Sequence, residues 1–295
     1  MEVQSCHKLL NVVSSNMLKG LKNLEEVSVK ECDSVEIIFE VEWLTVKGMN
    51  GTGILSQLRE LELWGLPKLF ASKHPILQKL EMKDEEVEKK PEERNSCIPI
   101  RPLFDEWVAF TNLEVLRIIN IENLQEIFPT ELPDKSFSQL KYLLVRGCHK
   151  LSRVAPSNLL PRLKNLEELI VEGCNSIKKI FELEGHVGQG YSATSLFQLE
   201  KVELRDLSNL KIFFSDNYNF DLPSLETLSL IVCPKMRTFS FGFISTPKLN
   251  TVTVEQNEQQ WKGDLNSTVQ HLFQEKQQNK GRRKRAEARH ETKVK

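Results

Sequence analysis

Cysteine has the widest range of possible chemistry here, because a thiolate can bind metals, form disulfides or act as a nucleophile. Five of the six cysteines occupy the same place in a repeated apolar pattern: Cys6, Cys32, Cys148, Cys174 and Cys233. A zinc site needs four ligands, and each neighbouring pair supplies only two. We therefore predict small buried thiols and no metal site, with a disulfide between neighbouring repeats as the alternative. Cys97, in a charged and proline-rich segment, is expected to be the most reactive thiol.

No arrangement of residues predicts catalysis. His7 and His149 follow two of the cysteines and, being next to inward positions, are expected to face solvent. The glycine-rich stretches GMNGTG from Gly48 and GHVGQGY from Gly185 lack the following lysine of a phosphate-binding loop, so we interpret them as flexible insertions. No acid/base pair or nucleophile constellation emerges either. We predict that the chain is not an enzyme and binds no cofactor.

A ladder of apolar residues recurs along most of the chain. Within residues 163–180 it falls at positions 163, 166, 169, 171, 174, 177 and 180, and the same spacing recurs within 137–154 and 222–239. Shorter copies begin at Leu24, Leu58, Leu113, Leu199 and Leu249, and a weak one covers residues 77–82. The L-x-x-L-x-L core alternates as a strand does, and the following steps of three indicate a return along the opposite side. One such unit cannot bury its apolar edge alone, so the units must stack.

This ladder is the signature of leucine-rich repeats. The predicted fold class is therefore an α/β solenoid, a leucine-rich-repeat horseshoe with a parallel concave β-sheet and irregular convex returns. We expect about nine to ten units over residues 1–262, with insertions near 41–54, 85–109 and 184–195. The middle insertion is charged and then proline-rich, which predicts a mobile loop.

A larger duplication overlies the repeats. VQSCHKL at residues 3–9 matches VRGCHKL at residues 145–151, and the offset of 142 persists to Glu40 and Glu182. Of the 38 aligned positions, 21 are identical. The same alignment places Met1 opposite Leu143, inside a strand. We therefore expect an array that is N-terminally truncated and begins part-way through a repeat.

The C-terminal end departs from the ladder. Asp264 is a candidate cap for a helix over residues 263–278 that would close the core with Leu265, Val269 and Leu272 on one face. Residues 279–295 are expected to form a disordered basic tail. Its cluster of Arg282, Arg283, Lys284 and Arg285 is a candidate nuclear-import signal or nucleic-acid contact, although most basic tails are simply solvated.

Charge and hydropathy narrow the choice of compartment and partner. The formal net charge is −1, but residues 263–295 carry nine Lys or Arg against four Asp or Glu, so the rest of the chain carries −6. An acidic body makes nucleic acid an improbable main partner. No apolar run reaches the ~18 residues of a membrane span, and the first residues lack the pattern of a secretory signal. Sequons at Asn50 and Asn266 match by chance often enough to carry little weight. We expect a cytoplasmic protein that does not enter membranes, with a nuclear location as the alternative that the basic cluster offers.

The concave face of the sheet is where binding information should lie, because its side chains are not used by the core. Strand alternation predicts polar outward residues near both ends of the array and an apolar patch in the middle. Such a rimmed patch often marks an interface; the alternative is loss of selection in a decaying array. The predicted binding residues are Val115, Arg117, Ile119, Tyr142, Leu144, Arg146, Ile170 and Glu172.

The cysteine-bearing repeats, the phrases LKNLEEL and F-x-QL, and the closing WKGDLNSTVQHLF resemble the C-terminal repeats of plant intracellular nucleotide-binding leucine-rich-repeat immune receptors of the coiled-coil class. The resemblance covers nearly all of residues 3–276. It implies effector-sensing and autoinhibitory repeats whose partner is a pathogen protein, a guarded host protein or a receptor switch domain. The family's ATP-binding domain has no counterpart, since no G-x-x-x-x-G-K-[ST] occurs. The alternative is a standalone leucine-rich-repeat scaffold or inhibitor, and the oligomeric state is left open.

Overall fold

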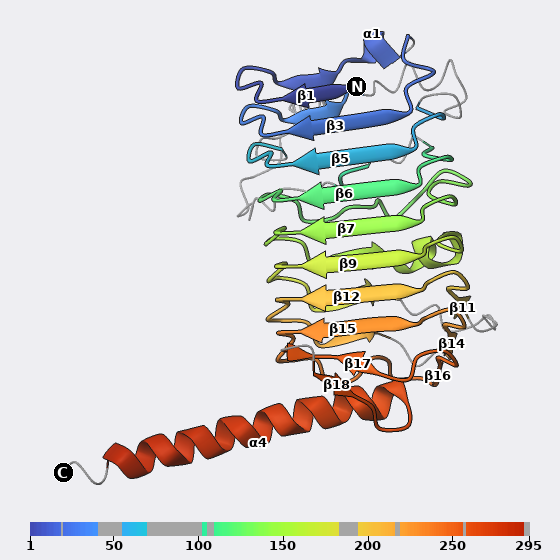
Figure 1. Ribbon diagram of the computed structural model, residues 1–295. Helices are drawn as coiled ribbons and strands as arrows, with labels where there is room; N and C mark the ends of the chain where they lie inside the picture. The colour runs from blue at the N-terminus through green and yellow to red at the C-terminus, as the bar shows by residue number, and fades with distance from the viewer. Residues whose placement is uncertain are drawn as a thin grey trace, which may run out of the picture.

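The computed structural model describes residues 1–18, 20–40, 55–69, 102–104, 109–182, 194–215, 219–255 and 258–291. In Figure 1 its strands lie one above another in chain order, from the N-terminus to a long helix at the C-terminal end. This arrangement confirms the predicted solenoid.

One ten-stranded sheet runs the length of the stack. Its strands are parallel and in register, except that the last pair is antiparallel. In order they are β1 (Glu2–Gln4), β3 (Glu26–Lys30), β5 (Glu60–Trp64), β6 (Val115–Ile119), β7 (Tyr142–Arg146), β9 (Glu168–Glu172), β12 (Lys201–Arg205), β15 (Thr227–Ile231), β17 (Val252–Thr253) and β18 (Gln259–Gln260).

Burial along the strands follows the predicted alternation. In β5 the side chains of Leu61 and Leu63 are fully buried, while Glu60 and Glu62 between them face outward. The residue after each central strand has a positive φ, as at Gly147 (65°). This left-handed turn redirects the chain into the core, where the ladder cysteine follows.

The returns carry smaller parallel sheets and an aromatic core. Phenylalanines from successive returns stack, for example Phe213 on Phe239 with ring centroids 4.3 Å apart. Among the described residues, one short α-helix and one 3-10 helix lie between the strands, α1 (Ser15–Leu18) and η1 (Ser157–Arg162). The strands are β2 (Asn11–Val13) with β4 (Ile37–Phe39); β8 (Arg153–Pro156), β10 (Lys179–Glu182) and β13 (Ile212–Phe214); and β11 (Thr194–Ser195), β14 (Phe220–Asp221) and β16 (Ile244–Ser245).

The insertion between β5 and β6 is described only in part. Since β5 pairs directly with β6, no strand of the concave sheet lies between them, and the weak ladder copy at residues 77–82 lies outside the described residues. At the end of the middle insertion Phe104 packs into the core, whereas residues 85–101, which make up most of the predicted mobile loop, lie outside the described residues. Phe104 is 3% exposed, and its backbone N–H bonds to the Ile127 carbonyl at 3.2 Å. Its ring centroid lies 4.8 Å from that of Phe110. Phe104 is buried here because removing an apolar side chain from water lowers the free energy of the folded protein.

The C-terminal helix begins where predicted but is longer. Asp264 caps it, since its carboxylate accepts the backbone N–H of Ser267 at 2.8 Å. The helix, α4 (Leu265–Glu291), continues through residues 279–291, which we expected to be disordered. Those residues are mostly Arg, Lys, Ala and Glu, all strong helix formers, and contain no proline. Beyond the first turns α4 projects away from the stack (Figure 1).

Candidate protein-binding site

The sheet register brings the eight predicted binding residues together on the concave face. Together with Glu168 they stand in three rows of three across β6, β7 and β9, at right angles to the strands. The rows are Val115–Tyr142–Glu168, Arg117–Leu144–Ile170 and Ile119–Arg146–Glu172. Neighbouring strands of a sheet lie ~4.8 Å apart, so these side chains form one continuous surface.

The members of this surface differ in how far they reach into solvent. Tyr142, Val115, Ile119 and Ile170 are half-buried. Leu144 is only 7% exposed although it points outward. It stands in one row with Arg117 and Ile170 on the adjacent strands, so long neighbours cover it. Leu144 therefore supports the surface from below, and the other apolar residues are its accessible part.

Trp64 belongs to the same surface and was missed by the sequence reasoning. It lies on β5 in register with Ile119 and is 38% exposed, which makes it the large apolar side chain that solvent reaches best on the described concave strands. Strand alternation predicts that Trp64 faces outward but assigns it to the polar N-terminal part of the array, with the weak copy at residues 77–82 between it and Ile119 in the sequence. The direct pairing of β5 with β6 removes that separation.

Ion pairs surround the apolar residues. Arg146 Nε lies 2.8 Å from Glu172 Oε2, and Arg117 Nη1 lies 3.4 Å from Glu60 Oε2. The Arg117 guanidinium also lies over the Tyr142 ring, 5.2 Å from its centroid. Every other Lys or Arg at an outward position of the described strands has a carboxylate partner as well. These pairs are Lys30–Glu62, Lys201–Glu168 and Arg205–Glu203.

These pairings set the charge that the concave face offers a partner. The Glu62 hydrogen bond raises the pKa of Lys30, and the Glu203 hydrogen bond raises the pKa of Arg205. Both side chains therefore stay charged well above neutral pH. Because each of these cations already has a carboxylate partner, this part of the concave face carries little unpaired positive charge.

Four of the five ladder cysteines are buried as predicted, namely Cys32, Cys148, Cys174 and Cys233, whereas Cys6 is exposed. Each buried thiol lies close to backbone groups of its own and the preceding repeat, as where Cys174 Sγ receives the Cys148 N–H at 3.4 Å. The hydrogen bond with the Cys174 thiol, followed by burial, raises the pKa of Cys148, and burial raises the pKa of Cys233 to about 12. Thiols held in this state are poor nucleophiles and poor metal ligands. Cys97 lies outside the described residues.

Other candidate residues stay apart from this surface. His7 and His149 are exposed, and His7 Nδ1 lies 2.8 Å from Asp33 Oδ2. Arg282, Arg283, Lys284 and Arg285 lie on the distal part of α4, far from the sheet (Figure 1). Both glycine-rich stretches and the sequon at Asn50 lie outside the described residues.

The second sequon, at Asn266, is engaged in the fold. The Asn266 side-chain oxygen accepts the Ser240 N–H at 3.0 Å and the Phe239 N–H at 3.2 Å, and its amide donates to the Gly242 carbonyl at 3.1 Å. The Thr238 hydroxyl completes the set at 3.0 Å. Asn266 therefore fastens α4 to the last return of the stack.

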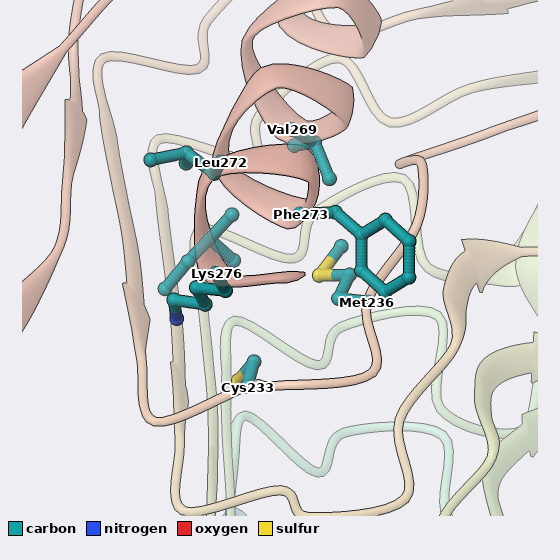
Figure 2. Close-up of a pocket in the computed structure, with 7 residues that line it drawn as sticks. Cys233, Met236, Val269, Leu272, Phe273 and Lys276 are labelled. Carbon is teal, nitrogen blue, oxygen red and sulfur yellow. The ribbon is translucent and has the colours of Figure 1, made fainter. Parts of the chain in front are cut away.

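A small cavity lies beside this contact. Figure 2 shows Cys233 and Met236 of the last return facing Val269, Leu272 and Phe273 of α4. Its volume of about 10 Å³ leaves room for roughly one water molecule. This seam between helix and stack is packing and does not offer a small-molecule site.

Two other kinds of site are absent from the described residues. No three His, Cys, Asp or Glu side chains among them gather as a metal would require. None of their helices combines the length and apolar character needed to cross a membrane.

Comparisons with known proteins agree with the repeat architecture. Residues 1–73 and 111–258 match a family model described as plant disease resistance protein RPS2-like, leucine-rich repeats. Over 145 residues the chain is 29% identical to a protein of Arabidopsis thaliana described as "Probable disease resistance protein At4g27220". That alignment covers 48% of this chain and 15% of the relative, so the chain spans a small part of the relative's length. No solved structure matches.

The segment that the family model leaves unmatched, residues 74–110, coincides with the insertion between β5 and β6. The matched residues make up more than half of the chain and include all ten strands of the concave sheet except the last. The chain therefore belongs to the leucine-rich-repeat family of plant disease resistance proteins of the RPS2-like type.

Proposed function

We propose that this chain is a protein-recognition module of a plant innate immune receptor, and that it senses a pathogen effector or a guarded host protein. A receptor switch domain is the third partner that the resemblance implies. The observation that carries the proposal is the accessible apolar surface in the middle of the concave sheet. We call it the concave patch; it comprises Trp64, Val115, Ile119, Tyr142 and Ile170, with Leu144 beneath.

The composition of the concave patch supports a protein partner. Trp, Tyr and Arg concentrate binding energy at interfaces, and an anchor of this kind is worth ~2 kcal/mol or more when truncated. The patch supplies Trp64 and Tyr142, and Arg117 and Arg146 lie beside them in defined positions. We infer no enzymatic activity, since the patch holds no acid/base pair or nucleophile.

The proposal places recognition inside the cell, in the cytoplasm and, through the basic segment of α4, in the nucleus. Nuclear import through Arg282–Arg285 is a separate expectation of this proposal. Replacing the four residues by Gln in a fluorescent fusion should abolish nuclear accumulation. An unchanged distribution would remove the nuclear part and leave the recognition proposal intact.

The test of recognition uses two variants, Trp64→Ala and Phe243→Ala, as baits to capture proteins from plant extracts. Trp64→Ala removes the most accessible residue of the concave patch, and Phe243→Ala removes a side chain that is 69% exposed but lies next to β16, away from the concave sheet. Both residues are exposed, so both variants should keep the parent's thermal stability. Quantitative mass spectrometry then compares the proteins that each bait captures.

We expect at least one protein to be captured by the parent chain and by Phe243→Ala, and to be reduced about tenfold or more with Trp64→Ala. Tyr142→Ala should reduce capture of the same protein. Equal capture by all the folded baits would show that the concave patch is not the interface.

A further inference from the structure

Three basic residues stand side by side on the returns in the C-terminal half of the stack. Lys178, Lys211 and Arg237 each come six residues after the end of a concave strand, namely β9, β12 and β15. The Lys211 N–H donates to the Lys178 carbonyl at 2.9 Å, and the Arg237 N–H donates to the Lys211 carbonyl at 3.0 Å. These bonds hold the three residues next to one another. We call them the basic strip.

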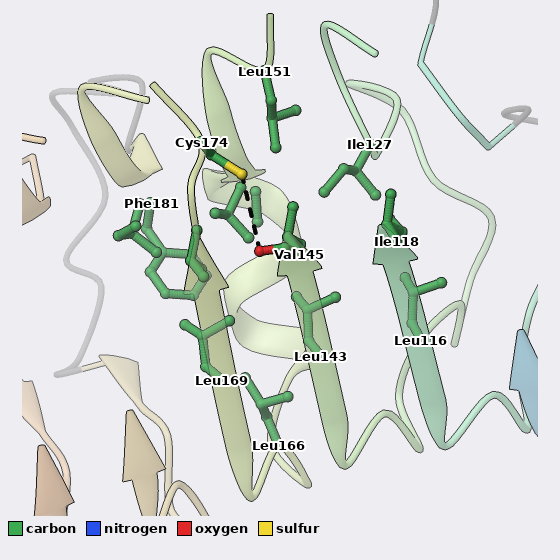
Figure 3. Close-up of a cluster of buried hydrophobic side chains, with 14 of the residues drawn as sticks. Leu116, Ile118, Ile127, Leu143, Val145, Leu151, Leu166, Leu169, Cys174 and Phe181 are labelled. Atoms are coloured by element: carbon green, nitrogen blue, oxygen red, sulfur yellow. Dashed lines mark hydrogen bonds between the residues drawn. The ribbon is translucent and has the colours of Figure 1, made fainter. Parts of the chain in front are cut away.

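The repeat pattern turns the side chains of the basic strip outward. The residue before each of them belongs to the core, since Ile177, Leu210 and Met236 are at most 3% exposed. Figure 3 shows their counterpart in the preceding repeat, Leu151, among the buried side chains. The three members of the basic strip are exposed. Their cations therefore follow one another along the surface, on backbones ~4.8 Å apart.

The cations of the basic strip have no carboxylate partner among the described residues. On the concave strands, by contrast, every outward Lys or Arg has one. The Arg237 guanidinium instead lies over the Phe273 ring of α4, 5.8 Å from its centroid, and this contact leaves its charge unpaired. Like charges held next to each other lower stability, so packing of the stack does not account for the basic strip.

The sequence around the basic strip also lacks carboxylates. Segments 175–179, 208–212 and 234–238 contain five Lys or Arg and no Asp or Glu. The equivalent segments 33–37 and 122–126, nearer the N-terminal end, contain four Asp or Glu and no Lys or Arg. None of the large apolar side chains that are exposed on described residues lies in the three basic segments. This part of the surface is therefore polar and positively charged.

We infer that the basic strip binds an acidic, extended segment of a partner protein. The strip is about 10 Å long between its first and third backbones, which about four residues of an extended chain can span. Carboxylates of such a segment would form charge-assisted hydrogen bonds with the two ammonium groups and the guanidinium. The partner thus supplies the anions that the described part of this chain does not.

An acidic protein segment fits this surface better than a nucleic acid does. Outside residues 263–295 the chain carries a formal charge of −6, so a long polyanion crossing the basic strip would be repelled by the rest of the body. The three basic segments contain no aromatic residue on which bases could stack. A short acidic segment covers the strip alone. The inference goes beyond the proposed function, because the basic strip lies on the returns and shares no residue with the concave patch.

The test measures binding of a fluorescein-labelled octaglutamate peptide at low salt by fluorescence anisotropy. The strip variant carries Lys178→Gln, Lys211→Gln and Arg237→Gln. The matched control carries Lys22→Gln, Lys68→Gln and Lys164→Gln, which remove the same charge from exposed lysines of separate positions. All six residues are exposed, so both variants should keep the parent's thermal stability.

We expect the strip variant to bind the peptide about tenfold or more weakly than the parent chain. The control should change the affinity less than about twofold, because scattered charges contribute only screened, long-range attraction. Trp64→Ala should bind the peptide as the parent does, which keeps this test separate from that of the concave patch. Absence of binding by the parent, or equal weakening in both triple variants, would overturn the inference.

Two further ligands test the class of partner. Octathymidylate, a single-stranded DNA of similar charge, and vesicles that contain phosphatidylserine are titrated in the same way. We expect both to bind the parent chain more weakly than the peptide does. Tighter binding of either one that the strip variant loses would assign the basic strip to nucleic acid or to a membrane surface, and would overturn the inference of a protein partner.

Discussion

The two ends of the stack meet solvent in different ways. At the C-terminal end, β17 is covered by the antiparallel β18, and α4 buries Leu265 and Val269 to 1% exposure. At the N-terminal end, β1 lies at the edge of the sheet, and Leu10 and Met17 remain 57% and 47% exposed. Among the described residues, apolar side chains are therefore covered at the C-terminal end and partly exposed at the N-terminal end.

This contrast shows what a repeat specifies and what it does not. Each repeat carries an apolar edge that needs a neighbour, so the pattern alone extends a stack without ending it. Closure requires sequence outside the pattern. Here residues 258–272 provide it, with a reversed strand, a capped helix and the Asn266 contact with the preceding return.

The largest expected difference between the ends comes from one substitution made at each. Leu265→Ala removes a fully packed side chain and should lower the free energy of unfolding by about 2–5 kcal/mol. Leu10→Ala removes a mostly exposed one and should change it by less than about 0.5 kcal/mol. Urea denaturation of both variants measures this, and losses of similar size would show that the two ends are equally closed.

Asn266 offers the next largest effect. Asn266→Ala leaves the N–H groups of Phe239 and Ser240 without their acceptor, which should destabilise the protein by about 2 kcal/mol. Asn16→Ala, at an exposed position of α1, is the control at the other end and should cost almost nothing. A loss for Asn266→Ala no larger than for Asn16→Ala would mean that this contact does not fasten the helix.

The cap of α4 sharpens the comparison further. Asp264→Ala should cost about 1 kcal/mol, because the Ser267 N–H loses its acceptor, whereas Asp264→Asn keeps an acceptor there and should be close to neutral. Thermal unfolding of both variants measures the difference. Equal loss in both would indicate that the charge of Asp264 matters rather than the cap hydrogen bond.

Features of the fold that depend on local sequence periodicity are predictable from the sequence, whereas features that depend on long-range strand pairing are not. The strand phase and the cysteine positions followed from local periodicity, as the burial of Leu61 and Leu63 confirms. The place of Trp64 did not, because it depends on whether residues 77–82 insert a strand, which is a long-range pairing question. The length of α4 was also missed, since charge and composition suggested disorder while helix propensity favoured continuation.

The experiment that perturbs the protein least compares the alkylation rates of two thiols, one at each end of the stack. Burial raises the pKa of Cys233 to about 12, so at pH 8 only about one molecule in 10⁴ carries the thiolate there. Cys6 is exposed at the other end. In the native chain, iodoacetamide should therefore modify Cys6 within minutes while Cys233 stays unmodified.

Leu265→Ala should speed modification of Cys233 and leave the rate at Cys6 unchanged, because the helix that covers Cys233 opens more often. Mass spectrometry of labelled peptides follows both sites in one sample. If Cys233 in the parent chain reacts as fast as Cys6, α4 does not close the stack in solution, and the contrast between the two ends disappears.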